Sequence, residues 1–262
     1  MRIMKTNGVA HHWREDGDPN GQPVVFANSL GTDLRLWDAL LPRLPDGFRL
    51  IRYDKRGHGL SECPDGPYEM DELVADAEGL IEGLGLGPVI FVGLSIGGMI
   101  GLALSAKRPD LMRALVLSNS ACKMGTPEMW NARIDAIREH GIDSQAELIL
   151  DRWFGAAFRE TPDVLLWRAM LTRTPVRGYL GCCAAIAGTD LSDTTRRLRL
   201  PVLGIAGTED GASPPEIVEE TCALILGSTC HTIPAAGHLP CVETPAAYAR
   251  ILAPFLKEHT HV

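Results

Sequence analysis

The sequence has little of what marks a membrane-spanning, secreted or nucleic-acid-binding protein. It contains no apolar run of about 18 residues, the length that a transmembrane helix requires, and its first residues lack the apolar core of a secretory signal. It also has no cluster of Lys and Arg, and its formal net charge is −8. We therefore expect a cytoplasmic protein with neither a membrane nor a nucleic acid as partner.

Features of disulfide frameworks, metal sites and dinucleotide loops are also missing. The seven cysteines form no CxxC pair, and the adjacent Cys182 and Cys183 cannot form an ordinary bridge. We expect all seven to be reduced thiols in the core. There is no HExxH or clustered ligand spacing, and Gly57 and Gly59 lack the strand context of a dinucleotide loop. The sequence therefore predicts no metal and no cofactor.

What the chain does contain is a regular alternation of apolar runs and helical periodicity. Strands are predicted at Val24–Ala27, Arg49–Tyr53, Val89–Leu94, Ala114–Ser118, Val202–Ala206 and Cys230–Ile233. Helices are predicted at Leu36–Leu44, Met70–Leu84, Gly97–Lys107, Pro215–Leu226 and Pro245–Glu258. This alternation indicates an α/β protein with a mainly parallel sheet and helices on both faces. We expect Ala10–Glu15 to add an antiparallel edge strand.

The strand signal disappears between Ser118 and Val202. Four helices are predicted there instead, at Pro127–His140, Ser144–Phe154, Pro162–Leu171 and Val176–Ala187. Because strands and helices alternate again afterwards, we predict a core domain of residues 1–120 and 190–262 with a helical cap, 121–189, inserted after strand 6. We expect this cap to cover the carboxyl ends of the strands, where open α/β sheets bind ligands. A separate bundle tethered there is the alternative.

Gly93-Leu94-Ser95-Ile96-Gly97 is a G-x-S-x-G pattern between an apolar strand and an apolar helix. In a nucleophile elbow the serine occupies a strained turn, the glycines keep side chains away from it, and the helix N-terminus favours negative charge. We predict that Ser95 is a nucleophile. The alternative is a tight strand–helix turn with an idle serine.

A serine hydroxyl is a poor nucleophile unless a base takes its proton, and in this arrangement the chain order is Ser, acid, His. Asp210 follows one predicted strand and His238 follows the next, so both stand in loops at strand ends. Asp210 is favoured over Glu209, which we interpret as a solvated turn residue. The sequence therefore predicts Ser95, Asp210 and His238 as a catalytic triad.

Acyl chemistry also requires two N–H donors that stabilise the oxyanion. One is the amide of Ile96, which follows the nucleophile, and the other comes from the loop after an early strand. Asn28-Ser29-Leu30-Gly31 occupies that loop, and we predict that the Leu30 amide points into the site. An ordinary loop with no exposed amide is the alternative.

The segment RYDKRGHGLS is another strand followed by a glycine-rich turn. We expect Asp54 and Arg56 to pair and Ser61 to cap, so that the three hold a tight loop. His58 is a second candidate base, but the chain order and His238 favour a structural role for it.

Together these motifs resemble those of the 3-oxoadipate enol-lactonases, within the α/β-hydrolase superfamily. The resemblance rests on NSLGTD, RYDxRGHGxS, GLSIGG, GYLGCCAAIAGTDL and AGHLPCVETP and spans nearly the whole chain. It implies an α/β-hydrolase fold with an eight-stranded sheet, and it implies hydrolysis of the enol-lactone of the β-ketoadipate pathway of aromatic degradation. Ser95 would attack the lactone carbonyl with His238 as base, and water would then release 3-oxoadipate.

The enol-lactone carries a carboxymethyl arm, so it is an anion approaching an acidic protein. An arginine of the cap would hold this carboxylate. The candidates are Arg133, Arg152, Arg168 and Arg173. Arg133 is favoured because it stands three residues after Trp130 on one helical face; an exposed helix arginine is the alternative. Trp130 is predicted to line the pocket, or else to pack the cap.

Two other functions stay open. One is a general carboxylesterase or lactonase of the same fold that acts on another small ester. The other is a non-catalytic receptor for a small molecule, although a receptor does not require the serine, acid and histidine that stand in register here. The sequence leaves the oligomeric state open.

Overall fold

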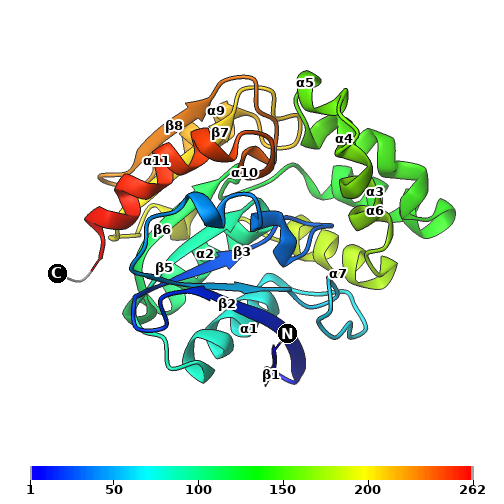
Figure 1. Cartoon of the computed structure of the whole chain (residues 1–262). Helices are drawn as coiled ribbons and strands as arrows, with labels where there is room; N and C mark the ends of the chain where they lie inside the picture. The colour runs from blue at the N-terminus through cyan, green and yellow to red at the C-terminus, as the bar shows by residue number, and fades with distance from the viewer. Residues whose placement is uncertain (1, 261–262) are drawn as a thin grey trace.

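The computed structural model describes residues 2–260, which contain an eight-stranded sheet with helices packed against it (Figure 1). The strand order is β1-β2-β4-β3-β5-β6-β7-β8. β1 and β4 both run antiparallel to β2, and all other neighbours are parallel. The strands are β1 (Arg2–Thr6), β2 (Val9–Gly17), β3 (Gln22–Ala27), β4 (Phe48–Tyr53), β5 (Val89–Leu94), β6 (Met112–Ser118), β7 (Val202–Gly207) and β8 (Thr229–Ile233). The predicted eight-stranded, mainly parallel sheet is confirmed.

β1, β2 and β3 follow one another without a helix; from β3 onward helices alternate with the strands, and the long connection between β6 and β7 carries several. The α-helices are α1 (Met70–Gly83), α2 (Ile96–Lys107), α3 (Pro127–His140), α4 (Ala146–Trp153), α5 (Ala156–Arg159), α6 (Val164–Thr172), α7 (Val176–Ala187), α8 (Ser192–Thr195), α9 (Pro215–Ala223), α10 (Pro240–Glu243) and α11 (Pro245–Glu258). Short 3₁₀ helices are η1 (Leu34–Trp37), η2 (Leu41–Arg43), η3 (Pro109–Leu111) and η4 (Ile142–Gln145).

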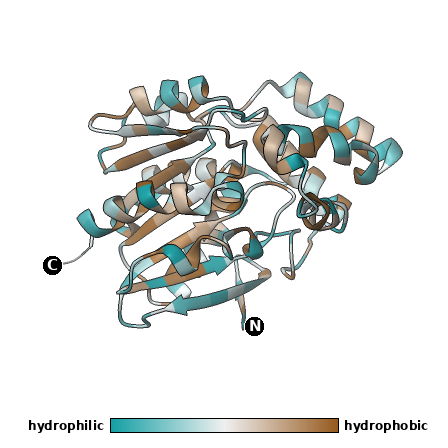
Figure 2. Ribbon diagram, turned by 45° about the horizontal axis from the view of Figure 1, so that its top comes forward, coloured by the Kyte–Doolittle hydropathy of each residue, from teal (hydrophilic) through white to brown (hydrophobic). Residues whose placement is uncertain are grey.

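The core lies along the central parallel strands. Every residue of β5 and β7 is buried, as expected for parallel strands that are covered on both faces. α1 and α2 pack together against the sheet, and α11 contacts β8 and η2. Figure 2 shows apolar strands in the interior and polar residues on the outer turns of the helices. Burial of each large apolar side chain contributes roughly 1.5–3 kcal/mol to folding.

The helix predicted at Leu36–Leu44 is wrong. The structure has two 3₁₀ turns there, η1 and η2. Asp33 caps η1 by accepting from the Arg35 amide, and Pro42 lacks the N–H that a continuous α-helix would require at that position. The apolar periodicity of this stretch therefore reflects two short turns that bury Leu36 and Trp37.

The strand expected at Ala10–Glu15 is antiparallel, but its predicted place at the sheet edge is wrong. It belongs to β2, and the edge is formed by β1, which the apolar pattern did not reveal because β1 has no fully buried residue. Asn7 and Gly8 join the two strands with φ of 49° and 78°. An Asn-Gly pair in this conformation is typical of two-residue β-hairpins. This pair was therefore the feature of the sequence from which β1 could have been predicted.

The helices from α3 to α7 all lie between β6 and β7 in the chain, and Figure 1 shows them gathered beyond one end of the sheet. α3 packs against α7, and α4 packs against α6. The predicted helices are present, although the one at Ser144–Phe154 begins as η4 and continues as α4. The division into a core of 1–120 and 190–262 and a cap of 121–189 stays a prediction, and residues 1, 261 and 262 lie outside the described part.

All seven cysteines are free thiols. Five are buried, but Cys63 and Cys230 are only half-buried, so the expected core position is wrong for these two. Cys182 and Cys183 both lie buried in α7. Within residues 2–260 no helix is long and apolar enough to cross a membrane.

The expected pair between Asp54 and Arg56 is also wrong. Arg56 binds Asp76 of α1 at 2.6 Å and Glu72 at 2.5 Å. Asp54 binds His12 at 2.8 Å instead. Burial by itself would raise the pKa of Asp76, but hydrogen bonds from Arg56, and His11 with its Nε2 at 3.5 Å, hold it below its ordinary value. The ionised carboxylate therefore stabilises the fold at neutral pH, and this contribution is lost as the pH falls through the acidic range.

We expect Asp76→Ala to lower the free energy of unfolding by about 3–5 kcal/mol, because it leaves the buried Arg56 charge without its main partner. Urea unfolding followed by circular dichroism measures this change. Asp135→Ala is the control, since it removes an exposed ion pair with Arg138 and should change the stability little. Equal effects of the two substitutions would contradict the proposed importance of the Arg56–Asp76 pair.

Candidate active site

Ser95 stands at a sharp turn between β5 and α2, with φ 58° and ψ −121°. Such a conformation is strained for a residue with a side chain. The backbone around it is tightly packed: a Cβ on Gly93 would lie 2.2 Å from the Gly97 carbonyl oxygen, and one on Gly97 would lie 2.2 Å from the Ala27 carbonyl oxygen. Glycine is required at both positions because the chain segments approach too closely for any side chain. The geometry is that of the predicted elbow.

Asp210 and His238 are brought together from the ends of β7 and β8. His238 Nδ1 lies 2.9 Å from Asp210 Oδ2, and both side chains are buried. The amides of Ala212 and Ser213 donate to Asp210 Oδ1, which fixes the carboxylate. Glu209 is exposed and accepts from the amide of Ala156, away from the histidine. The structure therefore places Asp210 beside His238, in the position predicted for the acid.

Ser95 follows β5, which β6 separates from β7, and it is held through its backbone. Its amide donates to the Ser118 carbonyl at 2.9 Å, and its carbonyl accepts from Ser120 Oγ at 2.6 Å. His238 Nε2 lies 3.4 Å from Ser29 Oγ. Within residues 2–260 no hydrogen bond joins Ser95 Oγ to His238. The sequence did not single out the Ser29 side chain, because its contact with His238 joins positions 209 residues apart.

Asn119 is a further site residue that the sequence did not reveal. Its Nδ2 donates to Asp210 Oδ2 at 2.9 Å and lies 3.3 Å from the Gly237 carbonyl oxygen. Its own Oδ1 accepts from Ser118 Oγ at 3.0 Å. Asn119 thus binds the same carboxylate oxygen as His238 and orients it. In the sequence, Asn119 could be noticed only as an asparagine directly after a strand. In the structure its φ is 47°.

The two predicted oxyanion amides, those of Leu30 and Ile96, have no acceptor within residues 2–260. Ile96 is the first residue of α2, so its N–H lies at the positive end of the helix dipole. The neighbouring Gly31 amide is not available, because it donates to His58 Nε2 at 3.0 Å. Burial and the nearby Lys55 charge hold the pKa of His58 well below its usual value. His58 is therefore a neutral acceptor that anchors the loop.

Arg133 and Trp130 lie together on α3. The Arg133 guanidinium is 4.8 Å from the centroid of the indole, and Trp130 Nε1 donates to the Met124 carbonyl at 2.6 Å. Arg133 also lies near the buried Tyr179, where its charge opposes the rise in the Tyr179 pKa that burial causes. A Cβ on Gly31 would lie 3.2 Å from the Tyr179 ring, so this chain of contacts leads from Arg133 to the oxyanion loop.

The other cap arginines differ in their partners. Arg168 is bound by the carboxylates of Asp143 and Glu147. No ion pair with Asp or Glu is formed by Arg133, Arg152 or Arg173 within the described residues. Of these three, Arg133 is the one with a contact to Tyr179, which packs against the loop of the site.

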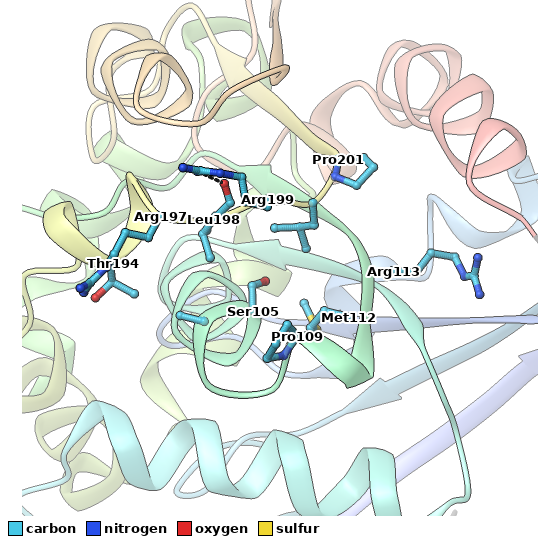
Figure 3. Close-up of a pocket in the computed structure, with 11 residues that line it drawn as sticks. Ser105, Pro109, Met112, Arg113, Thr194, Arg197, Leu198, Arg199 and Pro201 are labelled. Atoms are coloured by element: carbon cyan, nitrogen blue, oxygen red, sulfur yellow. Dashed lines mark hydrogen bonds between the residues drawn. The ribbon is translucent and has the colours of Figure 1, made fainter.

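Two surface cavities lie outside this site. One of about 620 Å³ is bounded by Ser105, Met112 and Pro201, at the amino ends of β6 and β7 (Figure 3). The other, of about 700 Å³, lies between α6 and η1. Neither is lined by the triad candidates. In the described part of the chain, no group of three or more His, Cys, Asp or Glu is placed to hold a metal ion.

Comparison with known proteins gives a consistent result. Residues 24–251 match the model of the alpha/beta hydrolase family. The chain is 32% identical to 3-oxoadipate enol-lactonase 2 of Acinetobacter baylyi over 97% of this chain and 96% of that protein. It superimposes on the enol-lactonase from Burkholderia xenovorans LB400 with a TM-score of 0.94 and 35% identity, covering 98% and 100% of the two chains. A thermophilic esterase from Thermogutta terrifontis, with malate bound, gives 0.92 and 29%, covering 99% and 100%. The resemblance that the motifs indicated is confirmed.

We expect Ser95→Gly to raise the free energy of unfolding by about 1 kcal/mol. Glycine relieves a backbone strain of about 1–3 kcal/mol, which exceeds its entropic cost of roughly 0.5–1 kcal/mol. Ser120→Gly is the control: it removes the hydroxyl that holds the Ser95 carbonyl and should lower stability. Urea unfolding measures the free energy of unfolding of both variants. A lower value for Ser95→Gly would contradict the proposal that the Ser95 backbone is strained.

Proposed function

The chain belongs to the alpha/beta hydrolase family, and we propose that it is a serine hydrolase that opens the lactone ring of 3-oxoadipate enol-lactone to give 3-oxoadipate. The observations that support this proposal are the contact between His238 and Asp210 at the ends of β8 and β7, and the strained backbone of Ser95 after β5. The proposed substrate is taken from the names of these relatives, which align over nearly the whole chain.

Acylation begins with Ser95 Oγ attacking the lactone carbonyl carbon while its proton moves to His238 Nε2. The oxyanion accepts hydrogen bonds from the amides of Leu30 and Ile96, which have no acceptor within the described residues 2–260. Asp210 accepts from His238 Nδ1, which orients the ring and stabilises the imidazolium. The oxyanion then collapses, the ring C–O bond breaks, and His238 Nε2 gives its proton to the leaving enolate oxygen. The enol that forms tautomerises to the 3-oxo group, and His238 is neutral again.

Deacylation uses water as the second substrate. His238 takes a proton from the water, and the resulting hydroxide attacks the acyl carbon through the same oxyanion site. The product leaves with a second carboxylate, and Ser95 regains its proton. Asn119 and the amides of Ala212 and Ser213 keep the Asp210 carboxylate fixed through both halves of the reaction.

The carboxymethyl arm of the substrate is proposed to bind Arg133 beside Trp130, under a cap formed by residues 121–189. Arg133 is half-buried and has no carboxylate partner in the described residues, so its charge is available to an anion. A guanidinium binds a carboxylate with two parallel hydrogen bonds.

The substrate assignment is tested by following loss of the enol-lactone absorbance with purified protein. We expect turnover of the lactone to exceed that of neutral esters such as p-nitrophenyl acetate. Ser95→Ala should reduce both rates by more than about 1,000-fold, because no other group in the site attacks the carbonyl. Ser105→Ala, on the same helix but hydrogen-bonded to the Gly101 carbonyl, is the control. A protein that turns over esters but not the lactone would be a general esterase.

A second experiment tests the carboxylate-binding residue. Arg133→Met should raise KM for the anionic lactone by about tenfold or more, since a charge-assisted hydrogen bond contributes roughly 1.5–3 kcal/mol. KM for p-nitrophenyl acetate, which carries no charge, should change little. Arg168→Met, whose arginine already binds two carboxylates, is the matched control. Equal effects on the two substrates would remove Arg133 from this role.

A further inference from the structure

Lys55 is a buried cation that the reaction above does not use. It follows β4, and its side chain is almost entirely enclosed. Its ammonium donates to the Ser29 carbonyl oxygen at 2.5 Å and lies 3.5 Å and 3.4 Å from the carbonyl oxygens of Asn28 and Thr32. Within residues 2–260 no Asp or Glu forms an ion pair with it. All of its hydrogen bonds therefore go to one loop, the loop that carries Leu30.

The Ser29 carbonyl and the Leu30 amide belong to the same peptide unit. A trans peptide is planar, and its C=O and N–H point in opposite directions. The Ser29–Leu30 bond is trans. Because Lys55 holds the carbonyl, the Leu30 N–H is directed to the other side of the peptide. The Ser29 hydroxyl lies 3.4 Å from His238 Nε2, so this peptide borders the reacting atoms.

We propose that Lys55 is a positioning residue of the oxyanion site: it fixes the Ser29–Leu30 peptide and polarises it, so that the Leu30 amide donates to the developing negative charge. The hydrogen bonds of the turn hold the Ser29 carbonyl, but they do not supply the charge that polarises the peptide. The Thr32 amide and hydroxyl also donate to the Ser29 carbonyl, at 3.3 Å and 2.9 Å, so the turn can persist without the lysine. What Lys55 adds is a full positive charge behind the peptide.

Two other side chains near Lys55 bind amides of the same loop. His58 accepts from the Gly31 amide, and Asp54 accepts from the Leu34 amide at 2.7 Å. These contacts hold the two ends of the turn but leave the Leu30 amide unbound. A buried charge also acts strongly on nearby dipoles, because little water screens it.

The pH dependence of this charge follows from its surroundings. Burial lowers the pKa of Lys55 to about 8, while the carboxylates of Asp54 and Asp33 favour its charged form. His58 also faces Lys55 but is neutral, and burial raises the pKa of Cys182 to about 12, so neither changes charge near pH 8. Lys55 is therefore charged at neutral pH and loses its charge as the pH rises through about 8.

The inference rests on the proposed function only in requiring acyl transfer at Ser95. It is tested with Lys55→Met, by measuring kcat and KM for the enol-lactone and for p-nitrophenyl acetate from about pH 6.5 to 9.5. We expect kcat at neutral pH to fall by about 10–100-fold for both substrates, somewhat less than the loss of an oxyanion donor. KM should stay within about threefold, since the contact acts on the transition state.

The pH profile distinguishes positioning from a merely structural role. In the unmodified protein kcat should fall as the pH rises through about 8, and in Lys55→Met this fall should be absent. Lys107→Met, which removes a surface ion pair with Glu78, is the control and should leave the profile unchanged.

A folded Lys55→Met protein with kcat within about twofold of the unmodified protein would overturn the inference. If that variant does not fold, the pH profile of the unmodified protein is the test. A kcat that stays constant as the pH rises through about 8 would also overturn the inference. Turnover of p-nitrophenyl acetate without turnover of the lactone would refute the proposed substrate but would leave the Lys55 experiment intact with the ester.

Discussion

The close backbone packing around Ser95 is the constraint on which the site depends. The Ala27 carbonyl at the end of β3 lies against Gly97 at the start of α2, and Gly93 lies against the same turn. This contact holds the strained serine and places it beside the loop that follows β3. The nucleophile and the loop with the Leu30 amide therefore have a fixed relation, set by backbone atoms before any side chain is considered. Backbone positioning of this kind suits catalysis, because donors aligned in advance need no reorganisation during the reaction.

The polar groups around Ser95 form two separate sets of contacts. Asn119, Ala212 and Ser213 fix the Asp210 carboxylate, which in turn orients His238. On the other side of the site, Lys55 and His58 hold the oxyanion loop by its carbonyls and by the Gly31 amide. Both sets of contacts are buried, so their electrostatic effects are stronger than they would be in water. The structure thus supports the reacting serine from two directions with separate networks.

The helices between β6 and β7 contact the loops that carry these groups. The amide of His238 donates to the Trp153 carbonyl at 2.7 Å, and Glu243 accepts from the amides of Gly237 and Gly155. Burial raises the pKa of Glu243 to about 7. Tyr179 of α7 packs against Gly31 and lies near Arg133, whose charge acts on the Tyr179 pKa. The position of α3 to α7 therefore bears directly on the loop that carries His238 and on the loop that carries Leu30.

The sequence by itself determined the features that depend on neighbouring residues. Apolar runs and helical periodicity gave most of the strands and helices, the glycines around Ser95 gave the turn, and the order of Asp210 and His238 at strand ends gave the pair that the structure joins. What only the tertiary structure decided were contacts between distant residues: β1 at the edge, Asp76 rather than Asp54 as the partner of Arg56, and the roles of Ser29, Lys55 and Asn119. Asn119 and Asp210 are 91 residues apart, and Lys55 and Ser29 are 26 apart. Such pairs meet because β6 lies beside β7 and β3 beside β4. Strand order follows from packing of the whole chain, so no local pattern contains it.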